Sequence, residues 1–262
     1  MTPRLTKPSG MSNWLACRYH VGEVLISRLW KDLKVEKSPE PHPSMFNKLK
    51  QHWEKFILLE GLQCNLRLFS DTIPLGLVEL YQQLLHNDYQ RHDIKELIEL
   101  CLTYIRAGEV DLVFRKPGAM HNARLMAKII YSLKIFMIRD FAEEKLPDLK
   151  ICTFEEYTLI TRFVNFCVLV YVPWWLTASN AADSVINDFL LVKKVSDYGL
   201  VDKDCSDSAT NSLKNQLWYL SAELIPLGWF CDKINDATKE KVAKEILLKR
   251  DEVSKIVLTF IS

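Results

Sequence analysis

The sequence predicts an all-α protein, built as an irregular multi-helix bundle. Glycine is scarce, with 8 residues in 262, and segments of alternating apolar and polar residues are hard to find. Apolar residues instead recur at the three- and four-residue intervals of amphipathic helices. They make up 48% of the chain and charged residues 26%, an ordinary globular balance. We expect a flexible tail over residues 1–12 and a single helical domain over residues 13–262, with a sub-division near 145–150 left open.

Caps and breakers set the expected helices in order. The first follows Ser12, which suits an N-cap, and ends before the polar, proline-rich segment 34–43. Pro173 should end the longest apolar helix, because proline lacks the N–H that continues the hydrogen-bond ladder. Residues 199–211, rich in Asp, Ser and Lys, should form a loop. The other expected helices are 45–56, 77–85, 94–107, one that follows Pro117-Gly118, 154–172, 178–197, 212–230 and 237–248.

Cysteine usage and the N-terminus point to an intracellular protein, with nucleus or cytoplasm left open. The seven cysteines are scattered singly, form no Cys-x-x-Cys pair, and several lie in apolar helical runs, as reduced cysteines do. The first ten residues lack the apolar region of a secretory signal. The most apolar run, 163–176, is shorter than the roughly 20 residues of a spanning helix, so we expect a buried core helix and no membrane partner.

Positive charge gathers in one part of a chain whose net charge is only +1. Residues 115–139 contain no acidic residue and hold Arg115, Lys116, Arg124, Lys128, Lys134 and Arg139. Within the expected central helix, His121, Arg124 and Lys128 share a face, away from the apolar one. An imidazole and a guanidinium one turn apart could hold a phosphate. The alternative is that this stripe is simply the solvated face of an amphipathic helix.

Two further groups of residues could carry chemistry. Cys17 and His20 lie one helical turn apart, with Glu23 continuing the row, which is half of a zinc site in residue type and spacing. No second pair completes it, so we expect no metal, and a buried cysteine beside a hydrogen-bonded histidine remains open. Glu223 lies in an apolar run just before Pro226, either as a snorkelling glutamate or as a functional carboxylate. The common nucleotide-binding and hydrolase motifs do not occur.

Three stretches in order carry a family resemblance: Trp-Leu-Ala-Cys-Arg-Tyr-His-Val-Gly-Glu, Pro-Gly-Ala-Met-His-Asn-Ala-Arg-Leu-Met-Ala-Lys and Leu-Trp-Tyr-Leu-Ser-Ala-Glu-Leu-Ile-Pro-Leu. Together they resemble the C-terminal half of transposon-derived proteins similar to hAT-like DDE/D transposases. The resemblance implies the helical insertion and terminal helix of such enzymes without their ribonuclease-H-like sheet. It matches Cys17 and His20 to a family motif, Arg124 to an arginine of the insertion, and Glu223 to the catalytic acid. The family's two aspartates would precede Cys17, and Leu125 replaces its tryptophan.

The expected function is therefore that of a catalytically inactive, transposase-derived helical protein that still binds DNA or RNA. Its nucleic-acid contacts would come from His121, Arg124, Lys128, Arg115 and Lys116. A second hypothesis is a protein-interaction scaffold or homodimer, joined through exposed faces that carry Trp174, Trp175, Trp218 and Trp229. A third is one part of a composite nuclease, in which another chain supplies the aspartates and with them a divalent metal. No other cofactor is expected.

Overall fold

The computed structural model describes residues 18–35, 44–60, 62, 69, 73–87, 91–105, 112–118, 125–177, 184–214, 236–237 and 240. Every regular element within these ranges is helical, and none of them is a strand. The predicted all-α fold is therefore confirmed for the part of the chain that the structure describes.

The helices follow the expected order, with changes at several ends. Their bounds are α1 Arg18–Asp32, α2 Ser44–Gln51, α3 Trp53–Ile57, α4 Leu77–Leu85, α5 His92–Ile105, α6 Leu125–Lys145, α7 Phe154–Phe166, the π-helical segment η2 Cys167–Tyr171, α8 Val172–Thr177, α9 Ser184–Tyr198 and α10 Lys203–Leu213. The bounds of α4 match the prediction. The helix expected over residues 45–56 is divided at His52, whose φ of −105° and ψ of 14° depart from helical values.

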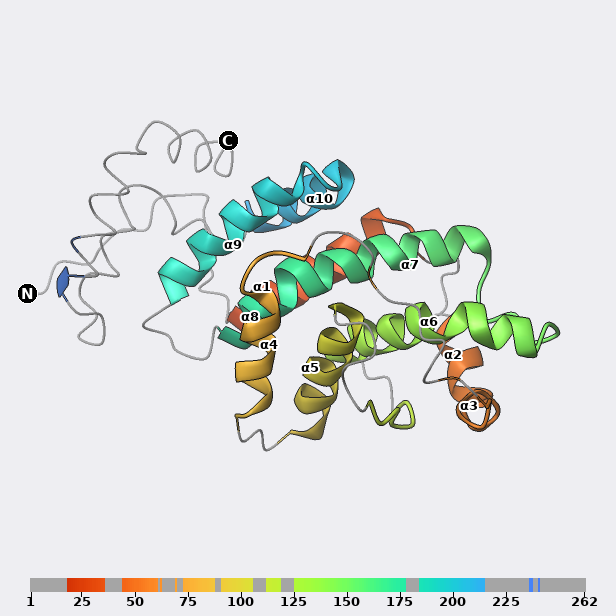
Figure 1. The fold of residues 1–262 in the computed structure, drawn as a ribbon. Helices are drawn as coiled ribbons and strands as arrows, with labels where there is room; N and C mark the ends of the chain where they lie inside the picture. The colour runs from red at the N-terminus through yellow and green to blue at the C-terminus, as the bar shows by residue number, and fades with distance from the viewer. Residues whose placement is uncertain are drawn as a thin grey trace, which may run out of the picture.

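The continuous run α7–η2–α8 lies at the centre of the described fold (Figure 1). On one side of the run, α7 packs against α6, and α6 packs against α5. On the other side, α9 and α10 cover the run, and α1 packs against α10. Side chains from all of these helices form one buried core, whose largest members include Trp53, Tyr81, Tyr104, Phe163 and Phe166. Two aromatic side chains, Tyr104 and Phe136, join α5 to α6 with ring centroids 4.9 Å apart.

The four described cysteines belong to this core. Cys101, Cys152, Cys167 and Cys205 are free thiols and are buried. Burial disfavours the thiolate and raises the pKa of Cys101 and of Cys152 to about 12. The expectation that cysteines of the apolar helical runs are unpaired is thus confirmed for Cys101 and Cys167.

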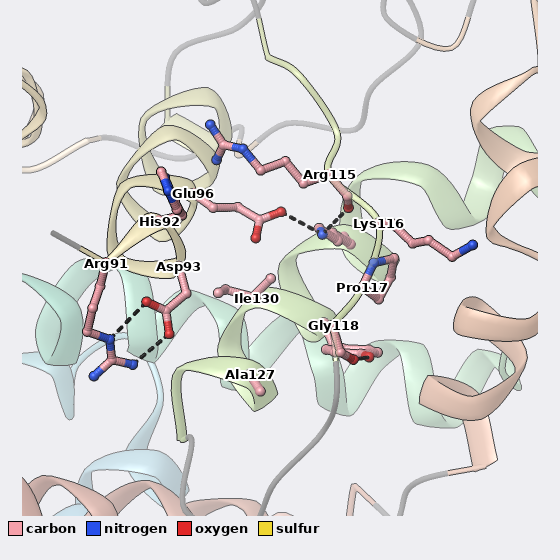
Figure 2. Close-up of a pocket in the computed structure, with 12 residues that line it drawn as sticks. Arg91, His92, Asp93, Glu96, Arg115, Lys116, Pro117, Gly118, Ala127 and Ile130 are labelled. Atoms are coloured by element: carbon pink, nitrogen blue, oxygen red, sulfur yellow. Dashed lines mark hydrogen bonds and ion pairs between the residues drawn. The ribbon is translucent and has the colours of Figure 1, made fainter. Parts of the chain in front are cut away.

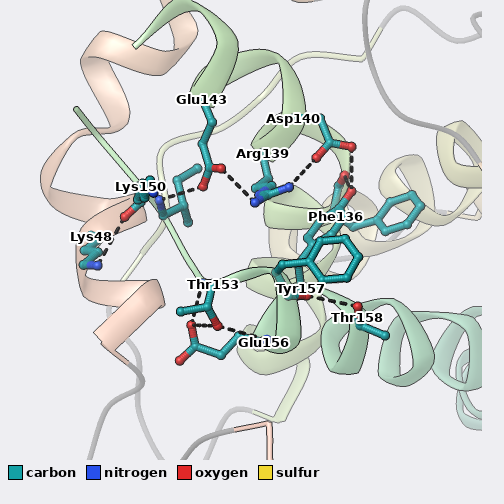
Figure 3. Close-up of polar contacts among 12 residues, drawn as sticks. Lys48, Phe136, Arg139, Asp140, Glu143, Lys150, Thr153, Glu156, Tyr157 and Thr158 are labelled. Carbon is teal, nitrogen blue, oxygen red and sulfur yellow. Dashed lines mark hydrogen bonds and ion pairs between the residues drawn. The ribbon is translucent and has the colours of Figure 1, made fainter. Parts of the chain in front are cut away.

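The turn between α6 and α7 is fixed by a network of polar contacts (Figure 3). The sequence predicts a break at Leu146-Pro147, and α6 indeed ends at Lys145. Glu143 accepts a hydrogen bond from the backbone N–H of Ile151 at 3.2 Å. Thr153 and Glu156 then form a reciprocal capping box, in which each side chain accepts from the other's backbone N–H. These contacts set the angle at which α7 leaves α6.

The prediction that Pro173 ends the apolar helix is wrong, because the helix continues to Thr177. In η2 the N–H of Val172 reaches the carbonyl of Cys167, five residues back, in the manner of a π-helix. The next N–H in that pattern would belong to Pro173 and would reach Val168. Proline cannot donate it, and the hydroxyl of Tyr81 donates to the Val168 carbonyl instead, at 2.7 Å. A side chain of α4 thus replaces the missing backbone donor.

The helical run Phe154–Thr177 is long and apolar enough to cross a membrane, with a mean hydropathy of 1.5 over its most apolar window. This corrects the expectation that the apolar stretch is too short. Within the fold, 67% of that window is buried against other helices. A largely buried core helix meets the same length and composition criteria, so the run alone is weak support for a membrane span.

The loop predicted over residues 199–211 is also wrong, because most of this segment forms α10. Asp202 supplies the N-cap, where its side chain accepts the N–H of Cys205 at 3.1 Å. Cys205, Ala209 and Leu213, four residues apart, are fully buried. The hydroxyl of Ser208 donates to Asp32 of α1 at 2.8 Å. Small polar residues, which suggested a loop, here let α10 approach α1 closely.

An ion pair joins the start of α10 to α7. Arg162 donates to both carboxylate oxygens of Asp202, each at 2.7 Å, and to Asp204 at 2.8 Å. Burial disfavours the charged form of Asp202, but hydrogen bonds from Arg162 and from Cys205 outweigh it. They lower the pKa of Asp202 from an ordinary 3.8 to about 2.

This low pKa predicts a specific loss of stability in acid. A carboxyl group whose pKa is lower in the folded chain stabilises the fold above its unfolded pKa, and this contribution disappears as the pH falls through its folded pKa. For Asp202 the window runs from 3.8 down to about 2. We expect Asp202→Asn, which retains an N-capping side chain, to reduce the fall in unfolding free energy across this window, as measured by urea unfolding at several pH values. The control is Asp207→Asn, at an exposed ion pair. If the unfolding free energy fell equally with pH in the wild type and in Asp202→Asn, the lowered pKa of Asp202 would be contradicted.

Candidate nucleic-acid interface

Several of the predicted site residues lie outside the described residues: Cys17, His121, Arg124 and Glu223. His20 belongs to α1, but its side chain is also outside what the structure describes. The half zinc site, the histidine–arginine pair and the late glutamate therefore stay predictions.

The first motif has a packing role at its glycine. A Cβ added to Gly22 would lie 2.9 Å from the hydroxyl of Tyr171 and 3.2 Å from the ring of Trp174. A larger residue would push α1 away from η2 and α8. Glu23, the next residue, is partly buried beside Tyr171, whose pKa is raised chiefly by burial and further by neighbouring acidic groups that include Glu23. This motif thus joins α1 to the central run.

The basic run contributes to a pocket of about 450 Å³ (Figure 2). Its walls come from the start of α5, from segment 112–118, and from the first half of α6. Arg115 and Lys116, two of the residues predicted to contact nucleic acid, line it, and so does Lys134. Arg91 and His92 also line it. Sequence reasoning missed this second pair, although an Arg-His dipeptide just ahead of an expected helix was a usable signal.

Lys134 belongs to the lining of this pocket and is fully buried. Its ammonium lies 2.7 Å from a carboxylate oxygen of Glu96, donates to the Arg115 carbonyl at 2.6 Å, and lies 4.9 Å from the centre of the Trp53 ring. Burial lowers the pKa of Lys134, and the Glu96 charge offsets only part of that effect. These contacts make Lys134 a structural residue.

Arg115 is likewise held by the fold. It pairs with Glu99 of α5 at 2.9 Å, and the side chains of the two residues are 36% and 16% exposed. The same segment is fixed at its end by Tyr131, whose hydroxyl donates to the Gly118 carbonyl at 2.6 Å. Segment 112–118 is therefore bound both to α5, through Arg115, and to α6, through Gly118.

Two other cations at the pocket are more exposed to solvent. Lys116 pairs with Glu54 of α3 at 2.7 Å, with side chains 63% and 64% exposed. Arg91 pairs with Asp93 at 2.6 Å, with side chains 53% and 27% exposed. Figure 2 shows Arg91 and Lys116 on opposite sides of the pocket. An exposed pair such as that of Lys116 with Glu54 contributes only about 0–1 kcal/mol, so a stronger anion can replace this carboxylate.

The remaining described cations of the run do not join the pocket. Lys128 lies over the Trp30 ring at 5.5 Å, and it is absent from the pocket lining although Ala127 and Ile130 belong to it. Arg139 pairs with Asp140 and Glu143 at 2.8 Å, beside α7 (Figure 3). Arg115, Lys116 and Lys134 of this run are thus paired with carboxylates of other helices, and Arg139 with carboxylates of its own helix that lie just beyond the run.

A second concave surface is an apolar groove of about 680 Å³ between the start of α4, η2 and the end of α9. Leu75 and Val201 line it and are exposed, and Leu200 next to them is exposed as well. Of the four tryptophans expected on an interaction face, Trp175 is partly buried against the core, and Trp174 is 4% exposed and donates to Asp188 at 2.8 Å. That part of the scaffold hypothesis is wrong, because the indole is a core side chain. Trp218 and Trp229 lie outside the described residues.

Comparison with known proteins adds no identification. No family model, no curated protein and no solved structure matches this chain. Within the described ranges no three His, Cys, Asp or Glu side chains gather as a metal site requires. The resemblance to hAT-like transposases therefore stays a prediction, which rests on the three motifs alone.

Proposed function

We propose that this protein binds nucleic acid through phosphate contacts at the pocket between α5, segment 112–118 and α6. The observation that carries the proposal is the position of two exposed cations, Arg91 and Lys116, on opposite sides of a preformed cavity. Its volume of about 450 Å³ is within the usual range of ligand pockets. We propose no catalysis, and Glu223 is then a vestige of a transposase ancestor.

The fold separates the cations that shape the pocket from those that can bind. Lys134 and Arg115 are committed to buried or half-buried carboxylates, and they hold the walls in place. Lys116 and Arg91 are themselves exposed, and they pair with the exposed Glu54 and the partly buried Asp93. A phosphate offers more acceptor oxygens than a carboxylate, and its binding also releases condensed counterions from the nucleic acid. Binding by this mechanism weakens steeply with salt.

Lys116→Gln tests the proposal because it removes one exposed cation and leaves the buried pairs intact. We expect fluorescence anisotropy to show weaker binding of single-stranded and duplex oligonucleotides alike, with the slope of log affinity against log salt reduced by about 1. The matched control is Lys203→Gln on α10, since Lys203 and Asp207 also form an exposed pair, at 2.6 Å. This control should bind like the wild type.

Two results would contradict the proposal. One is the absence of binding by the wild-type protein at low salt; the other is equal salt dependence in Lys116→Gln and wild type. In either case the apolar groove beside Leu75, Leu200 and Val201 becomes the leading surface, and a protein-interaction scaffold the leading function.

A further inference from the structure

We infer that the apolar groove between α4, η2 and α9 is the interface of a homodimer, in which two copies of this chain pack around a two-fold axis. This inference goes beyond nucleic-acid binding and does not depend on it. It follows from three features of one face of the molecule: the open groove, an exposed leucine beside it, and two opposite charges in its lining.

The groove offers apolar surface that the described chain leaves open. Leu75 and Val201 line it and are exposed to solvent, and Leu77, Leu80 and Leu169 also belong to its lining. Its volume of about 680 Å³ is enough to receive side chains from outside. Exposed apolar surface with a polar rim is typical of a protein–protein interaction site.

The side chain that fits this groove lies next to it. Leu200, in the turn between α9 and α10, is 95% exposed and does not line the groove, although Val201 does. Backbone hydrogen bonds hold the turn, from Leu200 to the Asp197 carbonyl at 3.2 Å and from Val201 to the Tyr198 carbonyl at 2.9 Å. Leu200 is therefore held in a defined position beside the groove, which lowers the cost of ordering it on binding. In a two-fold dimer each Leu200 enters the groove of the other copy.

The charges in the groove are complementary to a second copy of themselves. Lys194 and Asp197 line it from α9, three residues apart, and neither pairs with a side chain that the structure describes. Desolvation by the fold lowers the pKa of Lys194, and no carboxylate offsets it. Across a two-fold axis between two α9 helices, Lys194 of each copy meets Asp197 of the other. A second copy therefore carries both charges and the leucine that the groove requires.

Charge exchange tests this arrangement, with sedimentation equilibrium of the full chain over a concentration series as the measurement. We expect the wild type to dimerise, and Lys194→Glu and Asp197→Lys each to raise the dimer dissociation constant about 10-fold or more, because each brings like charges together twice. An equimolar mixture of the two variants again places opposite charges at both contacts. Its dissociation constant should return to within about 3-fold of the wild type, since exposed pairs differ little in strength.

Leu200→Glu tests the apolar contact. A carboxylate in each groove should raise the dissociation constant about 30-fold or more, as for the loss of a central interface residue. The thermal unfolding of the monomer should stay unchanged, because this side chain is exposed in the single chain. The matched control is Lys193→Glu, the same charge change at an exposed neighbour on α9 that does not line the groove. This control should dimerise like the wild type.

Four results would overturn the inference. They are a wild type that stays monomeric at every concentration, assembly beyond the dimer, a dimer that Leu200→Glu leaves intact, and a mixture of the two charge variants that associates no better than either alone. None of them bears on nucleic-acid binding, because the basic pocket contains none of the substituted residues.

Discussion

Lys134→Met should lower the free energy of unfolding by about 3–5 kcal/mol, the usual cost of breaking a buried ion pair by removing one partner. Methionine fills a similar volume, so the loss comes mainly from charge. The Glu96 carboxylate, 12% exposed, would keep its negative charge without the ammonium 2.7 Å away. The Arg115 carbonyl would lose its donor as well. Urea unfolding of the variant beside the wild type measures the difference.

A double variant separates charge from packing. Removing both charges, in Lys134→Met with Glu96→Met, should recover most of the loss, since apolar pairs replace buried ion pairs at little cost. Lys203→Met at an exposed pair is the surface control and should change stability by less than about 1 kcal/mol. A loss below about 1 kcal/mol in Lys134→Met itself would show that water reaches this ammonium in solution.

Tyr81→Phe should cost about 1–3 kcal/mol, because it leaves a buried carbonyl without a donor. The ring still fits, since only the hydroxyl that donates to Val168 is removed, and the residue is fully buried. The expected loss is large for the deletion of one oxygen atom, and thermal or urea unfolding can measure it.

Pro173→Ala provides the matching test, because alanine supplies the backbone N–H that proline lacks. In that background the Val168 carbonyl can accept from the backbone, so Tyr81→Phe should cost clearly less than in the wild type. The double-mutant cycle gives the coupling between the hydroxyl and the proline. Equal costs in both backgrounds would mean that Tyr81 does not replace the missing backbone donor.

The sequence predicted the fold class and most helices because their apolar residues recur at helical spacing. It failed where tertiary contacts override local signals. Pro173 does not end its helix, because a tyrosine 92 residues earlier in the chain supplies a hydrogen bond. Residues 203–213 form a helix because Asp202 caps them and α1 covers their small side chains. The local sequence of a segment does not show which distant residue or helix will contact it.

The sequence did not predict the pocket. The local excess of Arg and Lys suggested Arg115 and Lys116 as nucleic-acid contacts, which stays a prediction, and both residues line the cavity. The sequence did not reveal that carboxylates on α3 and α5 pair with these cations, because ion pairs between distant segments leave no periodic signal. It also placed Lys128 in the same group, whereas the helix carries that side chain toward Trp30.

The contact between α1 and α10 has a consequence for how the chain folds. Ser208 and Asp32, joined by a hydrogen bond of 2.8 Å, are 176 residues apart in the chain. At usual rates of synthesis, α10 leaves the ribosome on the order of ten seconds or more after α1. Until then α10 does not cover the apolar face of α1. Contacts between residues so far apart in the sequence also slow folding. During translation α1 is thus a candidate segment for chaperone capture.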